Sequence, residues 1–459
     1  MSTRPPLRVR LYGRHVADLA DVGFGDTALT YTAGALEAPS ASRLSLSLPV
    51  RAEQYPAVGP GGRWVRSLLP EGRALAWAVQ HFGIPEDDRY ALIGELGSDV
   101  AGAVEVLPEG AGSSEGGHYE PLSGDELASL VGRAHTVGLG LDRSRGVRLS
   151  LAGMQDKLLL HEHAPGQFSL PVRGAASTVI VKPEPPEADA ARPGVAGVAT
   201  NELFCLTLAR ECGLDTAAAR MERFGEMAAL VVVRYDRDMT RPPGAPFGRI
   251  HQEDLLGALG LDPLLKYERP QQQRHTPAGG FAPAEVVTAR GGPDLVALAG
   301  LLDTHLGRAR LATFLQAVAF NIAVGNADAH ARNYSVLLPP DGAPRFAPLY
   351  DVICTRYWPH LDSEAAQLVA GEDAIDKVSV EHLTREAARW GLTERLARSR
   401  VLKVLEAAAA HIDRAVEGCV ASGGDPDVAE AVAGLVRTRV RRLLDGARSA
   451  PASTGTRQG

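Results

Sequence analysis

The stretch of sequence that decides the fold runs from Asn321 to Asp351 and reads NIAVGNADAHARNYSVLLPPDGAPRFAPLYD. Its first residues complete an apolar helix that we expect to end near Gly325, because glycine readily adopts the left-handed conformation found at helix ends. The segments predicted after this helix are a polar loop at 326–333, a strand at 334–338, a Pro-Pro-Asp-Gly turn at 339–342 and a strand at 345–350. The stretch therefore predicts a helix, a polar loop and a β-hairpin in succession.

Polar side chains lie at both open ends of this predicted hairpin. A hairpin brings the open ends of its strands together, so Asn333 and Asp351 are expected to be neighbours, with Asp328 in the preceding loop. Two carboxylates and a carboxamide at one place supply the hard oxygen ligands that suit Mg²⁺. The sequence therefore indicates a magnesium site.

Asp328 and Asn333 also have a spacing known from phosphoryl transfer. Protein kinases use a catalytic-loop Asp, an Asn five residues later that binds metal, and a metal-binding Asp after a hairpin. Here Asp328 and Asn333 are five residues apart, and His330 lies between them, where a kinase loop often holds a cation that steadies the γ-phosphate. The alternative interpretation is a polar loop that caps a helix, with Asp328 and Asn333 as local turn formers.

A second segment could supply the cation for the phosphates of a nucleotide. Residues 177–182 read as a buried strand that ends in Lys182, and Glu202 follows at the start of the next helix. Lys182 is either a solvated strand end or a phosphate ligand, and Glu202 either pairs with it or simply complements the helix dipole. The upstream stretch 150–157, SLAGMQDK, has a single glycine and matches neither common phosphate-binding motif, but its backbone amides could still hold phosphate.

The composition restricts the class of protein. The chain has 459 residues, 45% of them hydrophobic and 22% charged, which excludes wholesale disorder and a disulfide-stapled miniprotein. Asp and Glu outnumber Lys and Arg by 55 to 48, so a surface that binds nucleic acid everywhere is not expected. The four cysteines form no C-x-x-C pair, and we find neither a signal-peptide pattern nor an apolar run of roughly 18 residues. We therefore expect a soluble cytoplasmic protein without a structural zinc site or a membrane contact.

Changes of pattern along the chain predict an α+β fold in several parts. These parts are an amino-terminal domain at 1–108, a linker at 109–123, a nucleotide-binding lobe at 124–238, a mostly helical carboxy-terminal lobe at 239–448 and a disordered tail at 449–459. The elements predicted within them include a strand at 43–48, a helix at 64–82, a helix at 124–138, a hairpin turn at 164–167, a helix from about 200 to 210 with Thr200 or Asn201 as N-cap, and a strand at 228–234.

Motifs spread over nearly the whole chain carry a family resemblance. They are LSLSLP (44–49), SLLP (67–70), GELGSDVAGA (94–103), SLAGMQDK (150–157), IVKP (180–183), NE (201–202), RYDR (234–237), QED (252–254), GNADAHARN (325–333) and PLYD (348–351). With these motifs the chain resembles the HipA family, the serine/threonine kinase toxins of bacterial HipBA toxin–antitoxin pairs.

The resemblance implies a two-lobed, protein-kinase-like α+β fold, distantly related to phosphoinositide kinases, with a small α+β amino-terminal domain and a mostly helical carboxy-terminal lobe. It implies that Asp328 is the catalytic base and that Asn333 and Asp351 hold Mg²⁺. The residues that it assigns to ATP are Ala152, Gly153, Met154, Gln155, Asp156 and Lys157 of the phosphate loop, Lys182, the hinge residues Val233, Arg234 and Tyr235, and finally His330, Asn333, Tyr350 and Asp351.

The resemblance further implies regulation and partners. Ser150 would be autophosphorylated, and the added dianion would disrupt the loop that must approach ATP, which suggests an off-switch. Members with known targets modify aminoacyl-tRNA synthetases, so such a protein is the expected substrate. The expected partner is a small HipB-like helix-turn-helix antitoxin that dimerises on operator DNA.

Two departures from the family pattern concern the hinge and DNA. Val233 stands where the family often has an acidic residue, which matters little if the hinge acts through its backbone. Residues 368–375 read LVAGEDAI and are acidic where the best-known member has a lysine-rich stretch that meets DNA, so we expect DNA contact only through the antitoxin. The arginine-rich run 437–442 could substitute, but a run of charge is usually a solvated helix face.

Two other functions remain open from the sequence. A small-molecule or lipid kinase on the same fold would need a hydrophobic or basic acceptor groove, which no pattern identifies. A non-catalytic antitoxin-binding protein would not need the set Lys182, Asp328, Asn333 and Asp351, which this chain retains.

Overall fold

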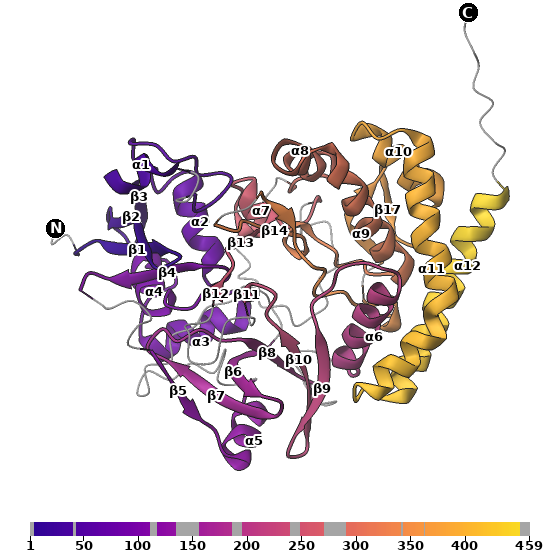
Figure 1. Cartoon of the computed structure of the whole chain (residues 1–459), viewed down its shortest axis with the longest axis horizontal. Helices are drawn as coiled ribbons and strands as arrows, with labels where there is room; N and C mark the ends of the chain where they lie inside the picture. Colours follow the sequence, from indigo (N-terminus) through magenta and orange to yellow (C-terminus); the bar gives the residue numbers. More distant parts are fainter. Residues whose placement is uncertain are drawn as a thin grey trace, which may run out of the picture.

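The computed structural model describes residues 4–39, 43–110, 117–134, 156–185, 195–238, 248–269, 291–340, 343–361 and 363–449. Figure 1 shows a strand-rich amino-terminal part on the left, a sheet in the lower middle and a helical lobe on the right. Ser150 and Ala152–Gln155 of the predicted phosphate loop lie outside the described residues.

The amino-terminal part is an antiparallel sheet covered by helices. The sheet has the order β3-β2-β1-β4, with β1 at Leu7–Leu11, β2 at Arg14–Asp21, β3 at Thr27–Tyr31 and β4 at Val104–Pro108. The helices are α1 (Ala33–Glu37), α2 (Pro60–Leu68), α3 (Gly72–Phe82) and α4 (Arg89–Leu96). Leu7, Val9 and Leu11 alternate with half-buried arginines, so the period of two predicts one buried face of the sheet.

The single helix predicted at 64–82 is wrong, because the chain forms two helices there. Leu69 ends α2 in an extended conformation, with φ −80° and ψ 153°, and Pro70 follows it. A proline disfavours the helical conformation of the residue before it, so the apolar pattern continues across a break that Pro70 enforces.

The strand predicted at 43–48 is also wrong. Leu44 and Leu48 are buried in the amino-terminal core, whereas Leu46 is buried in the core of the helical lobe. The backbone of this loop bonds to side chains of the other lobe: Leu46 N donates to Glu253 Oε1 at 2.6 Å, and Leu44 O lies 2.8 Å from His251 Nε2. The alternation therefore reflects a loop between two cores rather than the two faces of a sheet.

A six-stranded antiparallel sheet forms the middle of the molecule. Its order is β5-β7-β6-β8-β10-β9, with β5 at His118–Pro121, β6 at Leu158–Ala164, β7 at Gln167–Val172, β8 at Val179–Pro183, β9 at Ala219–Phe224 and β10 at Met227–Val233. The hairpin at 164–167 and the strand at 228–234 are confirmed by β6–β7 and by β10. Helix α5 (Gly124–Gly132) starts the region predicted as helical at 124–138, and residues 135–138 of that region lie outside the described part.

The two faces of β10 belong to different cores. Ala229 and Val231 are buried with the amino-terminal residues, whereas Leu230 and Val232 are buried with the helical lobe. Since neighbouring side chains of a strand point to opposite faces, β10 is apolar on both sides. The sheet that is expected to bind nucleotide therefore packs against the amino-terminal part on one face and the helical lobe on the other.

The predicted N-cap of helix α6 (Val198–Glu211) is wrong. The helix begins after Gly197, which has φ 84°, and Thr200 and Asn201 lie inside it and are buried. The carboxylate of Glu184, just after β8, accepts hydrogen bonds from the backbone N–H groups of Gly197, Val198 and Ala199. Glu184, which is distant in sequence, thus satisfies the amides that an N-cap side chain would usually bind. Thr200 and Asn201 are therefore not needed as N-caps.

The helical lobe contains α7 (Leu255–Ala258), α8 (Leu295–Leu306), α9 (Leu311–Val324), α10 (Val380–Arg389), α11 (Glu394–Ala421) and α12 (Pro426–Ser449). Three small sheets complete the described part: β11 (Arg237–Asp238) with β12 (Gly248–Arg249), β13 (Gln252–Asp254) with β14 (Ser335–Leu337) and β15 (Arg345–Phe346), and β16 (Glu364–Val369) with β17 (Glu372–Ala374). Helices α11 and α12 run side by side at the edge of the lobe (Figure 1). Within the described residues, no helix combines the length and the apolar character needed to cross a membrane.

Candidate active site

The loop that carries Asp328 is held rigidly at the end of α9. Helix α9 ends at Gly325 as predicted, with φ 77°, where a Cβ atom would lie 2.9 Å from the side chains of Arg356 and Arg439. Asn326 is buried; its Nδ2 donates to Asn321 Oδ1 at 2.8 Å, and its Oδ1 accepts from Asp328 N at 3.1 Å. At position 325, glycine is therefore needed both for the positive φ and for the close approach to the side chains of Arg356 and Arg439.

Asp328 and Asn333 face one another across this loop. Asn333 Nδ2 donates to the backbone oxygen of Asp328 at 2.9 Å, which leaves its amide oxygen directed away from that contact. Tyr267 donates its hydroxyl to Asp328 Oδ1 at 2.8 Å. The loop thus presents a carboxylate and an amide oxygen whose positions are both fixed by hydrogen bonds.

The hairpin predicted after the loop is present but short. β14 and β15 pair through Val336 with Phe346 and Leu337 with Arg345, and β13 adds a third strand. Asp351 follows with φ 56°, a left-handed conformation that is uncommon for a residue other than glycine. Such conformations persist where the surroundings enforce them, and they cluster at functional sites.

Lys182 joins the sheet to the end of this hairpin. Its Nζ lies 2.8 Å from Glu202 Oε1, 2.9 Å from Glu202 Oε2 and 2.9 Å from Asp351 Oδ1. Glu202 therefore pairs with Lys182, rather than only complementing the dipole of α6. Burial alone would raise the pKa of Asp351, but the Lys182 ammonium outweighs burial and lowers that pKa to about 2. For Lys182, the two carboxylates outweigh burial and raise the pKa above its usual value.

The two residues that the resemblance assigns to Mg²⁺, Asp351 and Asn333, both carry oxygen atoms of the kind that this ion binds. Asp351 retains Oδ2 beside the Oδ1 that binds Lys182, and its side chain is 43% exposed. Asn333 contributes an amide oxygen oriented by its own nitrogen. A carboxylate and an amide oxygen are ligand types that suit an ion that keeps waters and takes its remaining ligands from phosphates.

His330 differs from the cation expected at its position. Burial and the nearby Lys266 lower the pKa of its imidazole to about 4, so the ring is neutral at pH 7. Its Nδ1 is buried and has no hydrogen-bond partner among the described residues. The structure therefore has a neutral ring, packed edge-on against Tyr267, where a kinase loop often holds a cation.

Of the predicted phosphate loop, the structure describes the last two residues, Asp156 and Lys157. Lys157 is 6% exposed, and burial together with Lys182 lowers the pKa of its ammonium to about 7. Asp156 lies 3.6 Å from Arg73 of α3, so the amino-terminal part contacts this end of the loop.

The three predicted hinge residues have unequal roles in the structure. The side chain of Arg234 belongs to a buried polar network and is not free for a nucleotide. The backbone N–H of Arg234 donates to Thr178 O at 2.9 Å. Tyr235 donates its hydroxyl to Gln252 at 2.6 Å, and its ring centre lies 5.6 Å from that of Tyr350. Val233 lies at the end of β10. The backbone oxygen of Arg234 accepts from Arg237 N at 3.2 Å.

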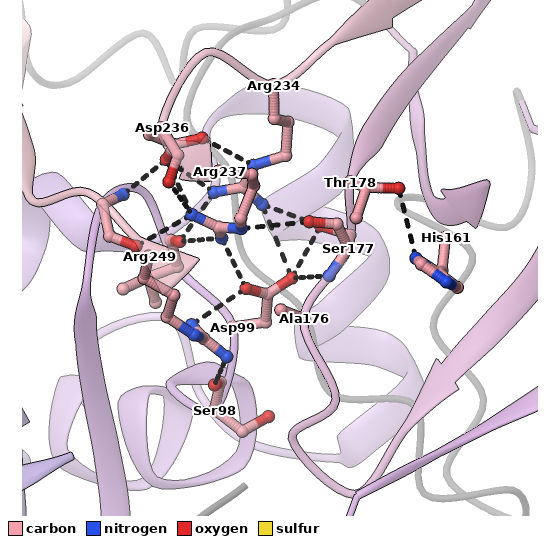
Figure 2. A network of polar contacts seen from close by, with 12 residues as sticks. Ser98, Asp99, His161, Ala176, Ser177, Thr178, Arg234, Asp236, Arg237 and Arg249 are labelled. Carbon is pink, nitrogen blue, oxygen red and sulfur yellow. Dashed lines mark hydrogen bonds and ion pairs between the residues drawn. The ribbon is translucent and has the colours of Figure 1, made fainter. Parts of the chain in front are cut away.

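Figure 2 shows the network that contains Arg234. Its centre is Asp99, which lies between α4 and β4 and is fully buried. Asp99 Oδ1 accepts from Arg237 at 2.7 Å and Arg249 at 3.0 Å, and Oδ2 accepts from the N and Oγ of Ser177 at 2.9 and 2.6 Å. The network bonds the amino-terminal part to the strand-end residues that precede β8 and follow β10.

Sequence reasoning missed three polar residues around the catalytic-loop candidates. They are Tyr267, which binds Asp328, Lys266, and Arg332, which contacts Glu71, Asp254 and the backbone oxygen of Ser67. One signal could have identified Lys266. Only five of the 48 basic residues are lysines, and three of these five, Lys157, Lys182 and Lys266, are buried in the structure.

The arginine-rich run on α12 is only partly a solvated face. Arg439 is buried and binds Asp376 and the backbone oxygens of Ile322 and Ile375. Arg442 donates to Val378 O at 3.1 Å. These two arginines therefore attach α12 to the rest of the lobe and are occupied by contacts within it.

Comparison with known proteins places these features in a family. The model of the HipA-like C-terminal domain matches residues 149–412, and that of the HipA N-terminal domain matches residues 7–107. The chain belongs to the HipA family. The protein named "Putative kinase Y4mE" of Sinorhizobium fredii is 32% identical over 416 residues, which are 88% of this chain and 90% of that relative. The serine/threonine-protein kinase toxin HipA of Shewanella oneidensis is 27% identical over 386 residues, covering 83% of this chain and 82% of the toxin.

A solved structure extends the likeness to the whole fold. In the complex of S. oneidensis HipA, HipB and operator DNA, a chain aligns with a TM-score of 0.77 and 24% identity, and the alignment covers 97% of this chain and 100% of that one. The predicted two-lobed, kinase-like α+β fold of the HipA family is therefore confirmed.

Proposed function

We propose that this HipA-family chain is an ATP-dependent serine/threonine protein kinase that acts as the toxin of a toxin–antitoxin pair. The observation that carries the proposal is the contact of Lys182 with both Glu202 and Asp351, at 2.8 and 2.9 Å. It joins the central sheet to Asp351, which follows the hairpin of β14 and β15. Kinases require this combination of a lysine paired with a glutamate and a metal-binding aspartate.

In this proposal each residue has a defined task. Asp328 orients the hydroxyl of a serine or threonine and accepts its proton as the oxygen attacks the γ-phosphorus of ATP. The bond from that phosphorus to the β–γ bridging oxygen breaks, and ADP leaves. Lys182 binds phosphate oxygens, and Asn333 and Asp351 would hold Mg²⁺, whose charge would offset that of the phosphates.

The nucleotide would lie between the phosphate loop and the hinge. Ala152–Lys157 would approach the phosphates, and the backbone at Val233–Tyr235 would bind the adenine. His330 and Tyr350 would contribute neutral surface near the ribose and phosphates. The buried Nδ1 of His330, which has no hydrogen-bond partner among the described residues, supports this, because such an atom needs a partner that a ligand can supply.

Regulation and partners follow from family membership. We infer that Ser150 is autophosphorylated and that its phosphate switches the kinase off. The partner would be a HipB-like helix-turn-helix antitoxin, through which DNA is contacted indirectly, and the substrate would be a cytoplasmic protein such as an aminoacyl-tRNA synthetase. The acidic residues Glu372 and Asp373 of β17 support indirect rather than direct DNA contact.

The test is phosphate transfer from labelled ATP. Purified protein with Mg²⁺ and a bacterial lysate is expected to label itself at Ser150 and at least one protein at serine or threonine. The variant Asp328→Asn should fold normally and transfer no phosphate. Full transfer by Asp328→Asn would overturn the proposed role, and label found only on small molecules or lipids would support a different kinase class.

A further inference from the structure

Lys266 is a buried lysine beside the catalytic-loop candidates, and the family resemblance assigns it no role. It follows the short helix η3 (Pro263–Leu265) and is 6% exposed. Its backbone oxygen accepts from Ala331 N at 3.1 Å and from Gln367 Nε2 at 3.3 Å. The adjacent Tyr267 donates its hydroxyl to Asp328. Two successive residues therefore lie directly against the loop of Asp328.

The ammonium of Lys266 is held loosely by its ion-pair partner. Its Nζ lies 3.5 Å from Glu71 Oε2, which is longer than the roughly 2.7–2.9 Å of a charge-assisted hydrogen bond. The other oxygen of Glu71 contacts Arg332. Burial lowers the pKa of Lys266, and the carboxylates that oppose this shift are those of Asp328, Asp351 and Asp254. The desolvated ammonium of Lys266 thus interacts electrostatically with Asp328, the proposed base, and with Asp351, the proposed metal ligand.

The choice of lysine at this position is informative because the chain uses so few. Of the five lysines, Lys377 and Lys403 are exposed, and the other three lie in and around the candidate site. Buried cations in the structural network of Figure 2 are arginines. An arginine presents a planar fork that suits a carboxylate, whereas a lysine is a compact point charge that can follow a moving phosphoryl group.

We propose that Lys266 is a second phosphate-binding lysine, which contacts the γ-phosphoryl group as it passes from ATP to the acceptor hydroxyl. The inference rests on the proposed function and extends it. Lys182 serves the phosphates that remain in ADP, and Lys266 serves the group that is transferred. Lys266 keeps its proton throughout, while the hydroxyl proton goes to Asp328, so its contribution is the stabilisation of negative charge on the transferring oxygens.

The test compares ATP with ADP, since only ATP carries the γ-phosphate. Calorimetric titration with Mg²⁺ present is expected to show that Lys266→Met weakens ATP binding about tenfold or more and ADP binding less than about twofold, with kcat lower by about 10²-fold. Lys403→Met, on the exposed face of α11, is the matched control and should behave as the wild type. Unchanged ATP binding, or equal losses for ATP and ADP, would overturn the inference.

A purely structural role of Lys266 is separated by Glu71→Gln. This change weakens the same ion pair and the contact with Arg332 but keeps the ammonium. We expect Glu71→Gln to retain the preference for ATP over ADP. If Glu71→Gln lost that preference as completely as Lys266→Met, the ion pair rather than a phosphate contact would explain the effect, and the inference would be wrong.

A measurement on the wild type needs no variant to fold. Amine acylation, mapped by mass spectrometry at the five lysines, is expected to fall at Lys266 more with Mg²⁺ and a non-hydrolysable ATP analogue than with Mg²⁺ and ADP. Lys377 and Lys403 should react equally in both. Equal protection of Lys266 would contradict the inference alone, whereas a wild type that binds neither nucleotide would overturn the proposed kinase function as well.

Discussion

Two buried ionic clusters of this protein differ in whether their carboxylate oxygens are all occupied by hydrogen bonds within the protein. Around Asp99, both carboxylate oxygens are occupied, by Arg237 and Arg249 on one and by Ser177 and Arg234 on the other. The side chains of Asp99 and Arg237 are wholly buried. The cluster has no capacity for a ligand and bonds the amino-terminal part to the ends of β8 and β10.

The cluster around Lys182 is incomplete by comparison. Asp351 uses one oxygen for Lys182, is 43% exposed and has the left-handed backbone conformation, with φ 56°. The cation is a lysine, which makes point contacts, and not an arginine, which satisfies a carboxylate bidentately. The Asp99 cluster is therefore saturated, whereas the Lys182 cluster keeps a partly exposed carboxylate on an uncommon backbone conformation.

The largest expected effect comes from removing the charge of Asp351. Asparagine tolerates the left-handed conformation, so Asp351→Asn should keep the fold and shift the melting temperature by only a few degrees. Phosphate transfer from labelled ATP should fall by about 10³-fold or more, because Lys182 and the proposed Mg²⁺ site lose their carboxylate. A variant that still transfers phosphate at the wild-type rate would contradict the role of Asp351.

The opposite result is expected at the saturated cluster. Asp99→Asn leaves three buried arginines without their carboxylate, which should lower the free energy of unfolding by about 3–5 kcal/mol. Asp413→Asn is a matched control, because Asp413 pairs with Arg437 on the surface with 87% exposure, and about 1 kcal/mol or less is expected. Denaturant unfolding of both variants measures the difference, and equal losses would contradict the distinction between the clusters.

The pH dependence of stability should also trace the Asp99 cluster. Burial opposes ionisation of Asp99, but Arg234, Arg237 and Arg249 outweigh it and lower its pKa from the ordinary value of 3.8 to about 2. Because the folded pKa is the lower one, the stabilisation is present above pH 4 and is lost as the pH falls towards 2, by about 2 kcal/mol. Unfolding measured across this range should depend less steeply on pH in Asp99→Asn than in the wild type.

The smallest loss of stability is expected from a change of Glu184, at the start of α6. Glu184 accepts hydrogen bonds from three backbone amides there and so fixes the helix that carries Glu202. Glu184→Gln keeps an acceptor but removes the charge that complements the helix dipole, so a loss of about 1 kcal/mol is expected. Denaturant unfolding would check this value, and a loss as large as that of Asp99→Asn would contradict the ranking.

Local patterns predicted much of this fold because local physics decides those parts. Gly325 ends α9, the chain reverses at 164–167, and the loop of Asp328 is followed by a hairpin that leads to Asp351. Where a distant contact decides the structure, the pattern misled. The alternation at 43–48 arises from two separate cores, and α6 begins earlier than predicted because Glu184 caps it.

The electrostatic states of the site were less accessible from the sequence. The neutrality of His330 results from burial and from the proximity of Lys266, which is distant in sequence. The assignment of Arg234 to the hinge did not reveal that its side chain binds Asp99 and Ser177. The charge state of His330 and the partners of Arg234 both depend on which charged groups folding brings together. The spacing of residues within one segment does not predict these contacts.

The amino-acid sequence alone determined the family, the order of the motifs and the candidate residues Lys182, Asp328, Asn333 and Asp351, because spacing within a loop and a hairpin is a local property. Tertiary structure decided which carboxylates share Lys182, that β10 is buried on both faces, and that Lys266 and Tyr267 lie against the loop of Asp328. These contacts join residues that are 20 to 169 positions apart, and only packing of the two lobes around the central sheet brings them within bonding distance.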